Sequence, residues 1–174
     1  ELRELPEVGA PSEEDPWLWR YELTRVARGA RGSSPVALKV SSKGEIVTIK
    51  RSADIDEWYR NRPEGFEQGF AIGSRLFSSA EGPLVLRGTV TTDLTLSRAS
   101  SDMVVYSRGQ TEVLRYAGLK VFDAHGKVLR ATLSYVPNSR GGVLDIRIDD
   151  SHAAYPLSVD PVAAVTPTPV ATNT

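Results

Sequence analysis

The sequence predicts an all-β fold, either an antiparallel β-sandwich or a partly open barrel. About a dozen short apolar segments follow one another at the spacing of roughly 8–12 residues that is typical of such folds. Gly, Ser and Asp occupy most of the gaps between them. No segment shows convincing helical periodicity, and a parallel sheet would need crossover helices. We therefore expect β packed on β, with a strand order that these patterns leave open.

The first expected strand covers residues 17–26. Its odd positions Trp17, Trp19, Tyr21 and Leu23 are apolar and alternate with polar side chains, which is the period-2 pattern of a strand with one buried face. Leu18 and Val26 blur the alternation, so a helix stays as the alternative for this segment.

The later strands are separated by turn residues. The clearest hairpin places Asp123, Ala124, His125 and Gly126 between two alternating segments, 119–122 and 128–135. The expected strands are 36–40, 45–51, 55–61, 66–72, 84–90, 94–96, 103–106, 113–116, 119–123, 128–135, 143–149 and 155–160.

Residues 57–70 (EWYRNRPEGFEQGF) form the most constrained stretch, because large aromatics, two glycines and a proline lie close together. Trp58 and Phe70 are predicted to anchor the core, and Pro63 and Gly65 to form the corner between two strands. Glu67, Gln68 and Gly69 are expected to hold fixed places on the second strand. Tyr155 is assigned a structural role as well.

The 174 residues are long enough for one domain that needs no metal or disulfide. We assign an extended acidic arm to residues 1–16, the domain to 17–162 and a Thr/Pro-rich linker or tail to 163–174. We also expect this tail, chiefly 162–166, or the arm to add a strand to an exposed sheet edge of the same or a neighbouring copy. Such contacts would build a head-to-tail assembly or homo-oligomer.

Composition narrows the class of partner. A net charge of −1 with 25% charged residues gives no reason to expect nucleic acid or an anionic membrane. No apolar run approaches the roughly 20 residues of a membrane span, so none is expected. The absence of cysteine does not decide the compartment, and a start at Glu1 is typical of a processed chain.

The sequence does not predict an enzyme. His125 lies at a hairpin tip, and His152 follows Asp149, Asp150 and Ser151 directly, whereas a catalytic triad converges from separate elements. We assign no catalytic residue.

No cofactor or metal is predicted. Zinc would need histidine or cysteine clusters, and no glycine-rich phosphate loop precedes a helix. Asp149 and Asp150, or the acids at 54, 56 and 57, are weak calcium candidates. Solvated turn acids are the favoured interpretation.

Four aromatic residues are candidates for stacking on a sugar: Trp17, Trp19, Trp58 and Tyr59. Aromatic residues at alternating strand positions more often fill a sandwich core, and this is the interpretation we favour.

Four segments together resemble the amino-terminal β-rich domain of large secreted or cell-surface bacterial proteins. They are EWYRNRPEGFEQGFAI, EGPLVLRGTV, LRYAGLKVFDAHGKVLRATLSY and LDIRIDDSHAAYPLSVDPV. In that family the domain precedes FG-GAP, SBBP, Ig-like or cadherin-like repeats. Phe66 stands where the family usually has leucine. The resemblance implies export and a neighbouring domain, and it brings no catalytic residues.

We therefore expect a non-catalytic structural or adhesive module of a secreted or cell-surface bacterial protein, with other proteins as partners. The alternative is a module that binds a ligand, either a glycan or one that depends on calcium. The indoles distinguish the two, because burial of Trp17, Trp19 and Trp58 favours the first and a coplanar exposed pair favours the second.

Overall fold

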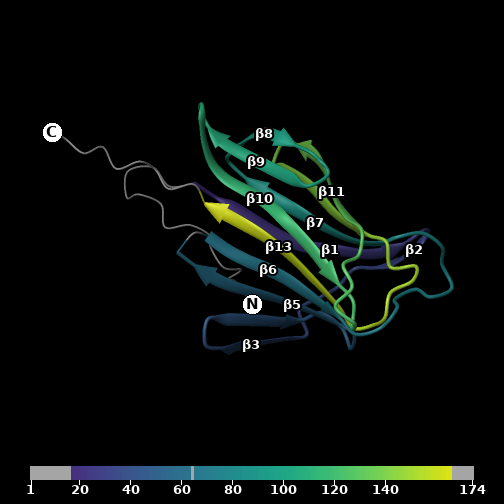
Figure 1. The fold of residues 1–174 in the computed structure, drawn as a ribbon. Coiled ribbons are helices and arrows are strands. Elements are labelled where there is room, and N and C mark those ends of the chain that lie inside the picture. Colours follow the sequence, from purple (N-terminus) through teal and green to yellow (C-terminus); the bar gives the residue numbers. More distant parts are fainter. Residues whose placement is uncertain (1–16, 64, 166–174) are drawn as a thin grey trace.

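The computed structural model describes residues 17–63 and 65–165, which form two antiparallel sheets packed face to face (Figure 1). The predicted all-β sandwich is confirmed. The described residues contain no helix, and hence none that could span a membrane.

The smaller sheet has five strands and the larger has eight. In spatial order the smaller sheet contains β11 (Ala131–Asn138), β12 (Gly141–Ile148), β7 (Leu84–Thr92), β1 (Trp19–Arg28) and β2 (Arg31–Ser33). The larger contains β3 (Lys39–Lys43), β4 (Ile46–Lys50), β5 (Ile55–Arg62), β6 (Gly65–Ile72), β13 (Leu157–Val165), β10 (Thr111–Phe122), β9 (Met103–Arg108) and β8 (Thr95–Ala99).

The core lies between the sheets because alternate residues of each strand point inward. In β1, for example, Trp19, Tyr21 and Leu23 are buried, as the alternation of this segment predicts. An aromatic cluster links the sheets, since the Trp19 ring lies 5.7 Å from Phe66 and 5.9 Å from Tyr116 between centroids. Offset and tilted aromatic pairs add specificity to the apolar burial.

The predicted hairpin around Asp123–Gly126 is wrong, because the chain changes sheets there. β10 belongs to the larger sheet and β11 to the smaller, and only Phe122 and Val128 form an isolated bridge. Asp123 fixes this crossover: its carboxylate accepts hydrogen bonds from the backbone N–H groups of His125, Lys127 and Ala154. The chain turns where the sequence predicts, but the second strand pairs with β12 of the other sheet.

Several strand boundaries also differ from the expectation by two or three residues, and two differences affect the topology. The segments 113–116 and 119–123 form the single strand β10, with a register shift between Ala117 and Lys120. β13 runs to Val165, beyond the expected domain limit at Val162. It pairs with both β6 and β10, so residues 162–165 lie in the middle of their own sheet and not at an edge. The arm 1–16 and residues 166–174 lie outside the described residues.

The corner between β5 and β6 forms as expected, since Arg62 and Gly65 are register partners. Pro63 is exposed and Gly65 is half-buried with φ 139°, so both act in the turn and not in the core. Phe70 is fully buried. Tyr155 is half-buried and packs against the core.

Trp58 is not the core anchor that the sequence predicts. It lies half-buried on the outer face of the larger sheet, opposite Gly69, where a Cβ would approach the indole within 2.1 Å. The Arg60 guanidinium lies over the indole, 5.9 Å from its centroid. In β5 the inward-facing positions are those on either side of Trp58, because Glu57 and Tyr59 are buried.

We expect Trp58→Ala to reduce the free energy of unfolding by about 1–2 kcal/mol. This lies between the range of roughly 0.5 kcal/mol for surface changes and the roughly 3–5 kcal/mol for a fully buried aromatic. Urea denaturation measures the difference. A loss above about 3 kcal/mol would show that Trp58 anchors the fold after all.

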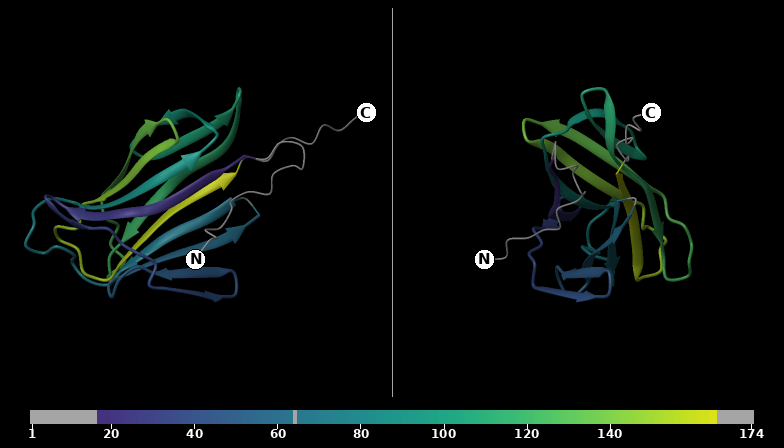
Figure 2. Two further views of the ribbon diagram at one scale, coloured as in Figure 1. Left: turned by 180° about the vertical axis from the view of Figure 1, so that it is seen from behind. Right: turned by 90° about the vertical axis from the view of Figure 1, so that its left-hand side faces the viewer.

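The different widths of the sheets leave the β3–β4 hairpin at the margin of the molecule (Figure 2). Val40 lies opposite Ile49, which lies opposite the buried Glu57, so Val40 faces the side on which the core forms. Its side chain nevertheless remains 46% exposed, and Val36 and Leu38 before it are 61% exposed. The larger sheet therefore ends in an edge strand with uncovered apolar residues.

Candidate functional site

The candidate sugar-stacking aromatics do not form a platform. Trp19 and Tyr59 are buried, and Trp17 is half-buried against the core. No ring pair among the described residues joins Trp17 or Trp58 to another aromatic ring. The indoles thus satisfy neither arrangement that would distinguish the two functional hypotheses, since they are neither all buried nor paired in a groove.

Asp150, a weak calcium candidate, is buried in an ion pair with Arg28, also buried. Arg28 Nη1 and Nη2 donate to its two carboxylate oxygens at 2.6 and 2.5 Å. The Tyr155 hydroxyl donates to Oδ2, and Arg75 Nη1 lies 3.4 Å from Oδ1. These bonds occupy both oxygens. Burial alone would raise the pKa of Asp150, but the hydrogen bonds and arginine charges outweigh it and hold that pKa below its ordinary value.

Asp149 is exposed, and its Oδ1 accepts the Ser151 hydroxyl at 2.7 Å. His125 and His152 are exposed as well. The Ser151 hydroxyl therefore donates to the aspartate and not to a histidine base. Among the described residues no three His, Cys, Asp or Glu side chains gather in a way that could hold a metal ion.

A second buried polar cluster centres on Glu57, which the sequence did not single out for this role. Arg51 Nε donates to Glu57 Oε2 at 2.8 Å, and the Tyr59 hydroxyl and Gln68 Nε2 donate to Oε1 at 2.5 and 2.9 Å. Tyr116 donates to Gln68 Oε1. All five residues are buried, so this network lies inside the core and is closed on itself. It stabilises the sandwich and offers no group to a substrate.

The accessible site lies on the outer face of the smaller sheet, where three neighbouring strands place arginines side by side. Arg25 on β1 is the register partner of Arg87 on β7, which is the partner of Asp145 on β12. Arg147 follows Asp145 by two positions and so shares the same face. A register shift between Leu23 and Arg25 in β1 brings Arg25 to this position.

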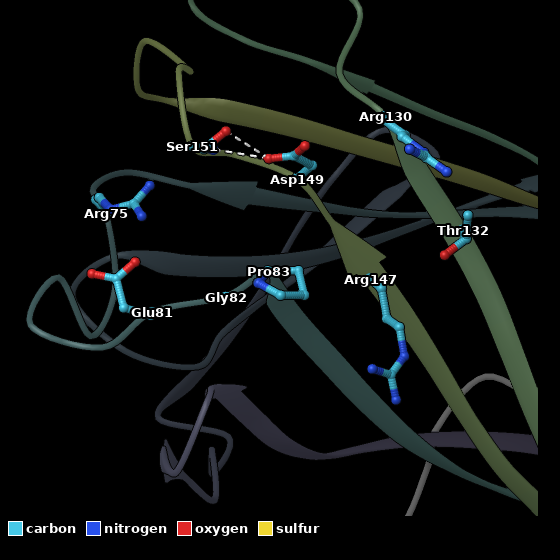
Figure 3. Close-up of a pocket in the computed structure, with 9 residues that line it drawn as sticks. All are labelled: Arg75, Glu81, Gly82, Pro83, Arg130, Thr132, Arg147, Asp149 and Ser151. Carbon is cyan, nitrogen blue, oxygen red and sulfur yellow. Dashed lines mark hydrogen bonds between the residues drawn. The ribbon is translucent and has the colours of Figure 1, made fainter.

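These arginines border two adjoining pockets, of about 440 and 280 Å³, that share Gly82, Pro83 and Arg147. We call their combined lining the arginine groove, defined by Arg25, Arg75, Arg87, Arg130 and Arg147. Figure 3 shows Arg75 and Glu81 on one side of the larger pocket and Arg130 and Arg147 on the other. Thr132, Asp149 and Ser151 complete the polar lining.

Positive charge exceeds negative charge in the arginine groove. Arg87 and Arg147 both bind Asp145, at 2.7 and 3.2 Å, and their side chains remain 45% and 46% exposed. The hydrogen bond and charge of Asp145 raise the pKa of Arg87 further. Arg130 is exposed, and its guanidinium has no hydrogen bond or ion pair within the described ranges. The groove therefore presents donors that lack acceptors.

Comparisons with protein-family models, with curated proteins and with solved structures find no match.

Proposed function

We propose that this chain is a non-catalytic structural or adhesive module of a secreted or cell-surface bacterial protein, and that it contacts other proteins through the edge of its larger sheet. The observation that carries the proposal is the exposed edge strand β3, with the exposed apolar residue Val40 within it and Val36 and Leu38 just before it. An exposed strand edge offers unpaired N–H and C=O groups to an extended segment of another chain.

The chemistry of β3 indicates which segment would bind. Lys39 and Lys43 point to the face opposite Val40, and an antiparallel copy of β3 centred on Ser41 would bring Lys39 against Lys43. Like charges directly opposite each other destabilise a strand pair. An extended segment with acidic residues therefore fits β3 better than β3 of a second copy does. Residues 1–16, with six acidic residues and one arginine, have that composition.

A non-catalytic role is supported by the hydrogen bonds that occupy the buried carboxylates. The carboxylates of Glu57 and Asp150 are buried, and each accepts hydrogen bonds from an arginine and a tyrosine. Such groups are held by structural bonds and are not within reach of a bound substrate. The proposed export and bacterial surface location depend on the family resemblance described above.

Light scattering over a range of protein concentrations tests the contact. We expect the chain to show a mass above that of a monomer, and the substitutions Leu38→Asp and Val40→Asp to return it to a monomer. Val136→Asp is the matched control, because Val136 is 62% exposed on β11, an edge strand of the other sheet, and it should change nothing. A parent chain that is monomeric throughout, or a control variant that dissociates equally, would overturn the proposed edge contact.

A further inference from the structure

We propose that the arginine groove binds an acidic polysaccharide. Its carboxylate or sulfate groups are held by Arg130, Arg147 and the neighbouring Arg25 and Arg87. This surface lies on the smaller sheet and is separate from the β3 edge. The inference therefore does not depend on the protein contact proposed above.

Short side chains line the narrower part of the groove between its arginines. Ala27, Val85 and Gly82 line its narrower part, and Arg25, Arg87 and Arg147 border them. Ala27 and Val85 are register partners, and Arg147 is the partner of Val85 on the other side. The Arg25 guanidinium extends over Gly32, where a Cβ would lie 2.8 Å from Nη2. Larger side chains at Ala27 or Val85 would fill the space that a linear ligand needs.

Buried bonds beneath the groove hold its rim in place before any ligand binds. Arg28 Nη1 donates to the carbonyl oxygen of Gly82 at 2.7 Å, and Arg28 Nε donates to that of Leu76 at 3.0 Å. Arg75 Nη1 donates to the carbonyl oxygen of Asp150 at 2.9 Å. The loop that carries Gly82 and Pro83 is thus tied to the buried Arg28–Asp150 pair. Preorganisation of this kind lowers the entropic cost of binding.

Charge favours an anionic ligand in spite of the nearly neutral chain. Residues 1–16 carry a net charge of −5, which leaves +4 for residues 17–174 out of the total of −1. Five arginines of the groove face Glu81, Asp145 and Asp149. Asp145 is already bound by two of them and Arg75 is already bound to Asp150, which leaves Arg25 and Arg130 for a ligand. Guanidinium groups bind carboxylate and sulfate oxygens with paired hydrogen bonds.

The remaining polar groups favour a glycan over a nucleic acid. Glu81 and Asp149 are acceptors that sugar hydroxyls can satisfy, and Thr132 and Ser151 bind hydroxyls in either direction. A DNA backbone has no hydroxyl groups along its sugars that could donate to these carboxylates, whereas a polysaccharide has them on each of its units. Single-stranded nucleic acid is usually held by stacking on aromatic side chains, and neither pocket of the groove has an aromatic residue in its lining.

Calorimetric titration with defined probes tests this inference. We expect heparin oligosaccharides, which carry sulfate and carboxylate groups, and oligogalacturonate, which carries carboxylate groups alone, to bind more tightly than neutral dextran of the same length. The affinity should fall as salt rises from about 50 to 200 mM, because the contacts are ionic. The ratio of the two affinities shows how much the sulfate groups and the higher charge density of heparin add to binding.

Substitutions locate the binding. Arg130→Gln combined with Arg147→Gln should weaken the affinity at least about tenfold, since each lost charge-assisted contact has an effect of this order. Ala27→Leu should weaken it without any change in charge. Arg98→Gln is the matched control, because Arg98 is exposed on β8 of the other sheet, and it should stay within about twofold of the parent. Urea midpoints of all variants show that each is folded.

Three results would overturn the inference. The first is that neither polyanion binds more tightly than dextran. The second is that Arg98→Gln weakens binding as much as the groove variants, which would reduce the effect to overall charge. The third is that a single-stranded oligonucleotide binds more tightly than both glycans and is lost in the same variants, which would assign the groove to nucleic acid.

Discussion

Arg28→Met is expected to reduce the free energy of unfolding by about 3–5 kcal/mol, because it leaves the buried Asp150 carboxylate without its main partner. The two side chains are 0% and 1% exposed, so water cannot replace the lost guanidinium. The carbonyl groups of Leu76 and Gly82 lose their donor as well. Urea denaturation at neutral pH measures the loss, and a value below about 1 kcal/mol would contradict it.

The double variant Arg28→Met with Asp150→Leu is the control. Replacing both members of a buried ion pair with apolar residues is often neutral, so the double variant should recover most of the stability. If it remains as unstable as the single variant, the loss comes from packing and not from the unpaired charge.

The pH dependence of stability follows from the same pair. Asp150 has a lowered pKa in the folded chain, so its ionised form stabilises the fold at a pH above the ordinary aspartate value of about 3.9. This contribution disappears as the pH falls through the lower folded-state pKa. In Arg28→Met the stability that is lost on acidification should be smaller, because the arginine that lowers the pKa of Asp150 is absent.

Glu57→Ala is expected to have an effect of similar size, about 3–5 kcal/mol, because the charge of Arg51 would remain buried without a partner. Arg51 is 8% exposed. The Tyr59 hydroxyl and the Gln68 amide would also lose an acceptor. Glu57→Gln keeps the shape of the side chain and should have a smaller effect. Thermal or urea unfolding gives both values.

Glu67→Ala provides the comparison on the next strand. Glu67 also pairs with arginines, Arg60 at 3.2 Å and Arg62 at 2.8 Å, but all three side chains are partly exposed. Exposed ion pairs contribute roughly 0–1 kcal/mol. Equal losses for Glu57→Ala and Glu67→Ala would show that burial does not determine the energetics of these pairs.

Alternation along single strands allowed much of the fold to be predicted. Trp19, Tyr21 and Leu23 recur at period 2 and are buried, and Pro63 and Gly65 mark a turn that forms. The sequence predicts the wrong face of the larger sheet for Trp58, because aromatic side chains are usually buried and glutamates are usually exposed. Glu57 can be buried because Arg51, Tyr59 and Gln68 donate hydrogen bonds to its carboxylate. The alternation of polar and apolar residues does not reveal these bonds.

The arginine groove could not be predicted from alternation along single strands because its residues come from different strands. Arg25, Arg87 and Arg147 each read as an ordinary exposed position on an alternating strand. They become neighbours only through the order β12, β7, β1 and the register shift after Leu23. Strand order depends on long-range packing, and sandwich connections of different topology leave similar traces in sequence.

The central place of β13 has a consequence for synthesis of the chain. The last described strand lies between β6 and β10, so the larger sheet consists of two separate parts until residues 157–165 have left the ribosome. Both flanking strands expose unpaired edges during that interval, and strand pairs with long sequence separation form slowly. The nascent chain is therefore expected to need protection of these edges, for example by chaperones, until residues 157–165 emerge.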